Sequence, residues 1–205
     1  MTGKFIVIEG IDGAGKSTQV ELLKSHPALQ GAHFTAEPTH EGIGAIVRTQ
    51  IRKDTPEYTP ETMAALLVAD RLEHLSAPET GLLARLQSGQ HVVCDRYVLS
   101  SLAYQSLTAP MELVWALNQP CLGLRLPDLT LYLDLTPEQS MARIEARGLA
   151  QDSFESLQNL TRIRAHYQEG LRRMPEHPCY QISADQSMDA VAAIVREKVD
   201  KVLSA

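Results

Sequence analysis

The chain has little cysteine and no long apolar run, and each shortage excludes a class of protein. Three cysteines among 205 residues are too few and too far apart for a disulfide framework or a zinc site. No apolar run reaches the ~18 residues that a membrane-spanning helix needs. The N-terminal segment MTGKFIVIEG lacks the long apolar core of a signal peptide. We therefore expect a cytoplasmic protein with reduced thiols.

Positive charge is also scarce. The chain has 19 Lys and Arg residues against 25 Asp and Glu residues, for a net charge of −6. Proteins that hold nucleic acid through its phosphates usually carry a basic excess. We therefore expect no nucleic acid and no membrane as partner, and any phosphate to be bound at one focused site.

Short apolar runs, each followed by a turn and a helical pattern, predict the fold. The three strongest runs are residues 5–9, 91–95 and 129–135, with weaker ones at 33–36 and 179–182. Runs without polar alternation are typical of strands covered on both faces, as in a parallel sheet. Helical periodicity appears at 16–25, 42–53, 60–88, 98–106, 110–119, 137–147, 153–173 and 187–203. The pattern predicts a doubly wound α/β fold, a five-stranded parallel sheet flanked by helices, in one domain of residues 1–205.

The segment GIDGAGKS, residues 10–17, fits the pattern G-x-x-x-x-G-K-[ST] between a predicted strand and a predicted helix. Its glycines let backbone amides approach an anion closely, and the helix N-terminus directs free N–H groups at the same point. Lys16 can reach the β- and γ-phosphates, and the Ser17 hydroxyl can ligate Mg²⁺. The alternative is a glycine-rich turn with an incidental lysine. The predicted ATP site comprises Gly10, Ile11, Asp12, Gly13, Ala14, Gly15, Lys16, Ser17 and Thr18.

A second set of polar residues begins in CDRYVLSSLAYQ, residues 94–105. Asp95 and Arg96 would lie at the carboxyl end of a parallel strand, where α/β sheets bind ligands. An acid there can hold Mg²⁺ or orient an acceptor oxygen, and an arginine can clamp a phosphate. The alternative is a helix-entry aspartate with a surface ion pair.

Two more arginines are candidates for an acceptor site. Arg71 lies in the otherwise apolar helix segment LLVADRLEHL, and Arg48 lies on the helix after Glu37–Pro38. Each has a simpler interpretation: Asp70 beside Arg71 could form a surface pair with His74, and Arg48 could be solvated.

These segments, in this order, resemble the thymidylate kinase family, in the nucleoside monophosphate kinase group of P-loop kinases. The resemblance rests on EGIDGAGKSTQ (9–19), EPT…IG…R (37–48), ADR (69–71), DRY..SS.AYQ (95–105), LPDLTLYLDLTPE (126–138) and a lid-like RIEARGLAQDSFE (143–155). It implies the architecture of that group, and transfer of the γ-phosphoryl group of ATP to dTMP with Mg²⁺. It also implies a homodimer.

The resemblance also assigns roles. Lys16, Asp95, Arg96, Arg143 and Arg147 would be catalytic, with Ser17 and Asp95 at the metal. Arg48 and Arg96 would grip the acceptor phosphate, whereas Arg71 and Gln105 would read the thymine edge. The implied acceptor site comprises Glu9, Asp12, Pro38, Arg48, Leu67, Arg71, Arg96, Ser100, Tyr104 and Gln105.

The sequence departs from the family pattern at several positions. Ala36 stands where arginine is frequent, and Leu67 where a phenylalanine stacks on thymine. Gly13 and Ser153 stand where members carry a catalytic arginine, so we expect Arg147 or Arg143 to cover the transferred phosphoryl group. The changes predict weaker dTMP binding or relaxed base choice. Two alternatives stay open: a kinase for another nucleoside monophosphate or nucleoside, and a P-loop ATP-binding switch protein.

Overall fold

The computed structural model describes residues 2–53, 57–146 and 156–204. Five parallel strands form one sheet, as predicted, and their order is β2-β3-β1-β4-β5. In the central strand, Ile8 lies opposite Asp95 of β3 and Leu131 of β4. The strands are β1 (Phe5–Gly10), β2 (His33–Ala36), β3 (Val92–Asp95), β4 (Leu129–Asp134) and β5 (Cys179–Ser183).

The sheet is covered on both faces. All six residues of β1 are buried. Phe5 and Val7 belong to one apolar cluster, whereas Ile6 and Ile8 belong to another, because successive side chains of a strand point to opposite faces. This explains why the sequence of β1 is apolar without alternation.

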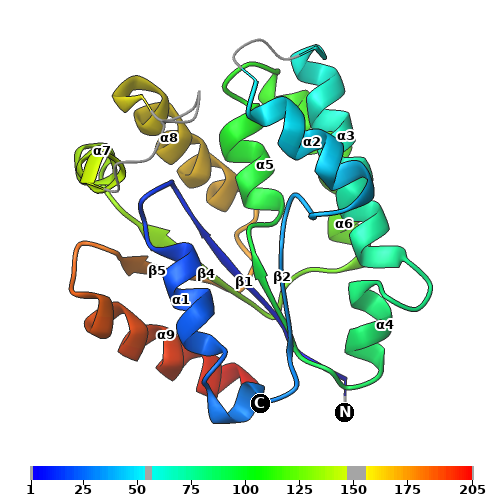
Figure 1. The fold of residues 1–205 in the computed structure, drawn as a ribbon, viewed down its shortest axis with the longest axis vertical. Coiled ribbons are helices and arrows are strands. Elements are labelled where there is room, and N and C mark those ends of the chain that lie inside the picture. Colours follow the sequence, from blue (N-terminus) through cyan, green and yellow to red (C-terminus); the bar gives the residue numbers. More distant parts are fainter. Residues whose placement is uncertain (1, 54–56, 147–155, 205) are drawn as a thin grey trace.

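Helices form a layer on each side of the sheet (Figure 1). On one side α1 (Lys16–Leu23) packs against α9 (Met188–Leu203). On the other side lie α3 (Pro60–Ser76), α4 (Leu82–Gln87), α5 (Val98–Gln105), α6 (Met111–Leu124) and α8 (Leu157–Arg173). α2 (Gly42–Ile51) packs on α3, α7 (Pro137–Ala146) packs on α8, and a short 3-10 helix spans Pro27–Leu29.

Two predicted helices have the wrong bounds. The pattern over 60–88 is two helices, because Pro78 disfavours the helical conformation for Ala77, whose ψ is 130°. A side chain at Gly81 would also come within 2.6 Å of the Ala77 carbonyl oxygen. The helix predicted at 110–119 instead continues to Leu124 with Pro120 inside it.

The carboxyl ends of the strands point toward one edge of the molecule. The loops after β1, β2 and β3 begin there, at Gly10, Ala36 and Asp95. Within the described residues, no helix is both long and apolar enough to cross a bilayer. Open α/β sheets bind ligands beyond the carboxyl ends of their strands, so a ligand site is expected at this edge.

Candidate active site

A cavity of about 760 Å³ lies at the carboxyl ends of β1, β2 and β3. Its wall brings together three loops that are far apart in the sequence: residues 12–19 after β1, 36–38 after β2, and 95–96 after β3. Helices α2, α3 and α5 add Arg48, Leu67, Arg71, Ser100, Tyr104 and Gln105, and α7 adds Arg143. Most of the predicted site residues therefore share one cavity.

The glycine-rich loop forms one end of this cavity. Gly15 has φ 93° and caps the N-terminus of α1. The buried Lys16 ammonium donates to the Ile11 carbonyl at 3.0 Å and lies 3.8 Å from Asp12 Oδ1. Burial and the nearby charge of Arg96 lower the pKa of Lys16. An anion bound here would meet both Lys16 and the free N–H groups of α1.

Ser17 and Asp95 meet beside the loop and could hold a metal ion. The Ser17 hydroxyl donates to Asp95 Oδ2 at 3.1 Å. The second carboxylate oxygen, Oδ1, is buried and accepts no hydrogen bond from any described residue. Mg²⁺ prefers oxygen ligands and binds through one or two carboxylates together with substrate phosphates and water. These residues therefore fit Mg²⁺.

Helix α7 closes tightly on Gly13. Gly13 has φ 78°, and a Cβ atom there would lie 2.9 Å from the Ser140 carbonyl oxygen. An arginine at position 13 therefore has no room. Arg143 of α7 reaches the loop instead, donating to the Gly13 carbonyl at 3.3 Å and the Ala184 carbonyl at 2.8 Å. Arg147 and Ser153 lie outside the described residues.

Asp12, Arg96 and Tyr104 form a cluster in the middle of the cavity wall. Asp12 accepts from Arg96 at 2.5 Å and from the Tyr104 hydroxyl at 2.8 Å, and the Arg96 guanidinium lies 4.7 Å from the centre of the Tyr104 ring. Burial would raise the pKa of Asp12, but the charges of Arg96 and Lys16 outweigh it and lower the pKa to about 2. Arg96 has φ 74°, a conformation that non-glycine residues adopt rarely and mostly at functional sites.

The other end of the cavity is formed by the loop after β2 and by α2 and α3. The Arg48 Nε donates to the carbonyls of Pro38 at 2.9 Å and Thr39 at 3.0 Å. The Glu37–Pro38 peptide bond is cis. Leu67 lines this end without a ring, and Ala36 lines it without a charge. These two positions therefore add neither a ring nor a charge to this end of the cavity, whereas Arg48 and Arg71 add charge.

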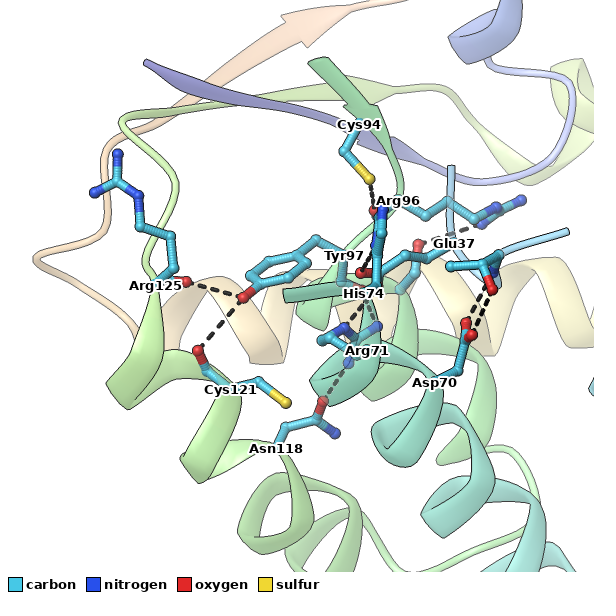
Figure 2. Close-up of polar contacts among 12 residues, drawn as sticks. Glu37, Asp70, Arg71, His74, Cys94, Arg96, Tyr97, Asn118, Cys121 and Arg125 are labelled. Carbon is cyan, nitrogen blue, oxygen red and sulfur yellow. Dashed lines mark hydrogen bonds and ion pairs between the residues drawn. The ribbon is translucent and has the colours of Figure 1, made fainter. Parts of the chain in front are cut away.

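Arg71 lines this end of the cavity and belongs to a buried polar network (Figure 2). Its Nε donates to Glu37 at 2.6 Å, its Nη2 donates to the Tyr97 carbonyl at 3.0 Å, and its Nη1 donates to Asn118. His74 also binds Glu37, at 3.0 Å. Asp70 accepts from Thr39 rather than forming the surface pair with His74. Arg71 is therefore not a solvated helix residue.

Three predicted residues lie behind the cavity rather than on its wall. Gly10 and Ile11 belong to the base of the loop, and Glu9 is fully buried. The Glu9 carboxylate accepts from the backbone N–H groups of Tyr97 at 2.8 Å and Ser100 at 3.1 Å. Burial raises the pKa of Glu9 despite these bonds. Glu9 therefore caps the N-terminus of α5 from the adjacent strand.

Sequence reasoning missed several residues of the site. Glu37, His74 and Asn118 surround Arg71, and only weak signals mark them: a charge at a strand end, a histidine one turn after Arg71, and an amide in an apolar helix. At the other end, Ala184, Gln186 and Met188 line the cavity although their segment shows no motif.

Comparison with known proteins gives a consistent result. A family model described as thymidylate kinase matches residues 8–194. A thymidylate kinase of Caulobacter vibrioides is 39% identical, over 96% of this chain and 96% of its own length. A protein of the same name from Alkalilimnicola ehrlichii is 35% identical, over 95% of this chain and 91% of its own length. Another from an Exiguobacterium species is 35% identical, over 93% of this chain and 91% of its own length.

Proposed function

Since the chain belongs to the thymidylate kinase family, an enzyme family that phosphorylates dTMP, we propose that its cavity binds ATP and dTMP end to end for direct phosphoryl transfer. One observation carries this proposal. A single cavity has a glycine-rich loop with Lys16 at one end, Arg48 and Arg71 at the other, and Arg96 between them. Two anionic substrates need such paired positive groups if their phosphates are to meet.

At the donor end, we propose that the amides of residues 13–18 and the Lys16 ammonium hold the β- and γ-phosphates of ATP. Ser17 and Asp95 would hold Mg²⁺, which supplies charge neutralisation across the phosphates when bound. Support comes from the Ser17–Asp95 hydrogen bond and from the buried, unpaired Oδ1 of Asp95 among the described residues. Arg143 is the lid-side arginine that reaches the loop, at the Gly13 carbonyl.

At the acceptor end, we propose that Arg96 and Arg48 bind the dTMP phosphate, with Pro38, Leu67, Arg71 and Gln105 around the base. Arg96 is bound to Asp12, so an incoming phosphate would compete with a carboxylate for it. Release from Arg96 would free Asp12 to accept a hydrogen bond from a sugar hydroxyl. Ser100 and Tyr104 lie beside Arg96 on α5 and would border the sugar.

We further propose a cytoplasmic homodimer. The three cysteines are free thiols, as expected in a reducing compartment. Ile46 on α2 is an exposed apolar side chain, which suits a helix that meets a second copy.

The test is ADP formation from ATP and Mg²⁺ with dTMP, dUMP, dCMP, dGMP, AMP or thymidine, each offered alone. We expect turnover with dTMP that disappears when EDTA removes the metal. The Leu67 and Ala36 substitutions favour one alternative, a kinase with relaxed base choice, and turnover spread evenly over several acceptors would support it. No turnover above the ATPase background would overturn the proposed function.

A further inference from the structure

The buried network around Arg71 holds its guanidinium in one orientation. Its three nitrogens are fixed by three different elements: Glu37 after β2, the Tyr97 carbonyl before α5, and Asn118 on α6. The guanidinium also lies 5.1 Å from the centre of the Tyr97 ring. A planar group held on three sides and against a ring has a fixed plane.

These contacts leave some of the N–H donors of Arg71 available to a ligand. A guanidinium has five N–H donors, and the described residues accept from Nε and once from each terminal nitrogen. Arg71 also lines the cavity although it is only 2% exposed. Its remaining donors can therefore meet an acceptor atom in the cavity, and their direction depends on the groups behind it.

Glu37, the carboxylate partner of Arg71, is itself held in place by a second hydrogen bond. Glu37 uses Oε2 for Arg71 and Oε1 for His74 Nδ1, at 3.0 Å. Burial would raise the pKa of Glu37, but Arg71 and His74 outweigh it and lower the pKa, so the carboxylate is ionised and only accepts. His74 Nδ1 therefore carries a proton. On its other side, His74 Nε2 lies 3.0 Å from the Thr35 hydroxyl of β2.

Asn118 is fixed in the same manner at the opposite end. Its side-chain amide donates to the Val114 carbonyl one turn earlier, at 2.8 Å, which turns the oxygen toward Arg71. Buried polar groups of this kind cost free energy unless every partner is satisfied, and apolar residues could often replace them without loss of stability. These groups surround Arg71 (Figure 2), and Arg71 and Glu37 line the cavity, which indicates a use in recognition.

We propose that His74 is a positioning residue for acceptor-base recognition, acting through Glu37 on Arg71 while Asn118 fixes the other end of the guanidinium. The inference rests on the proposed function, in which Arg71 faces the base. A donor-only arginine in a fixed place favours a carbonyl over an amino group at the base edge. Loss of the contact between His74 and Glu37 would let the Arg71 guanidinium move and would therefore weaken the preference for thymine over cytosine.

Two substitutions of His74 separate this role from simple packing. In His74→Asn the amide nitrogen takes the place of Nδ1 and keeps the bond to Glu37, whereas in His74→Gln it takes the place of Nε2 and keeps the bond to Thr35. We expect His74→Gln to raise KM for dTMP about tenfold, as for loss of one hydrogen bond to a charged group. We also expect it to lower the kcat/KM preference for dTMP over dCMP. KM for ATP should not change, and His74→Asn should show a smaller rise.

Equal effects of the two variants on KM for dTMP, or a parallel rise in KM for ATP, would overturn the proposal in favour of a structural role. Asn118→Leu is the second variant if His74→Gln does not fold. It should likewise raise KM for dTMP alone, and an unchanged KM would also overturn the proposal. Failure of the proposed function is distinguishable, because the unmodified protein would then not turn over dTMP at all.

Discussion

At the scale of single residues, Leu67 is the side chain on which our proposal for base binding can be tested most directly. The side chain is 6% exposed and lines the cavity. It offers dispersion contacts to a base but no ring to stack on.

A ring restored at this position should tighten acceptor binding. Stacking of a base on an aromatic side chain contributes about 1–3 kcal/mol, so Leu67→Phe is expected to lower KM for dTMP roughly tenfold. Leu67→Met, which changes shape without adding a ring, is the control and should leave KM within about twofold. Steady-state kinetics on both variants check this, and equal KM values for the two would show that a ring at this position does not reach the base.

The location of a residue could be predicted where a motif fixes both its type and its place. The loop around Lys16 and the pair Asp95–Arg96 lie where the spacing predicted, because a glycine-rich turn between strand and helix has few possible geometries. Glu9 could not be placed from sequence. Its direction depends on which helix packs over β1, and α5 takes up its carboxylate.

At the scale of elements, the contact between the glycine-rich loop and α7 determines which positions can place an arginine next to the loop. Gly13 packs under Ser140, and Arg143 from the same helix lies over the loop. An arginine on α7 can therefore bring positive charge to the loop, whereas a side chain at position 13 would collide with α7.

This contact can be measured with two glycines of the loop. Both Gly13 and Gly15 have positive φ, so alanine at either position costs about 1–2 kcal/mol of backbone strain. Among the described residues, Gly13→Ala also meets a neighbour, whereas nothing beyond the adjacent residues of the chain lies within 4 Å of a Cβ at Gly15. Gly13→Ala should therefore lower the free energy of unfolding more than Gly15→Ala, as measured by urea denaturation. An equal loss would mean that α7 moves away without cost.

Element types were predictable from periodicity, whereas several bounds were not. The strands agree with prediction to within one residue, because apolar runs flanked by turns are short and sharply limited. The break between α3 and α4 was not predicted, because Leu82 and Leu86 continue the apolar pattern of α3. Pro78 was the local signal that outweighed the periodicity.

At the scale of the whole molecule, the proposed dimer is open to direct measurement. Light scattering on the eluted protein should give about twice the chain mass of 22.6 kDa. Ile46→Lys places a charge on an α2 side chain that is 47% exposed and should shift the mass toward one chain. Leu126→Lys, at a side chain that is 45% exposed elsewhere, is the matched control and should leave the mass unchanged. A dimer that survives Ile46→Lys would show that another face is used.

The cavity has two halves with separate supports, and this has an evolutionary consequence. The residues that we propose face the phosphate donor come from the loop after β1, α1 and α7. Those that we propose face the base come from the end of β2 and from α2, α3 and α5. Among the described residues, Asp95 at the end of β3 bonds to Ser17, and Arg96 after it bonds to both Asp12 and Ser100. The Tyr104 hydroxyl of α5 also donates to Asp12, so the two halves meet at this cluster. Substitutions such as those at Ala36 and Leu67 can therefore accumulate on one side while the other keeps its geometry. A lineage of such proteins can change its preferred nucleobase gradually, without passing through ancestors that have lost the capacity to use ATP.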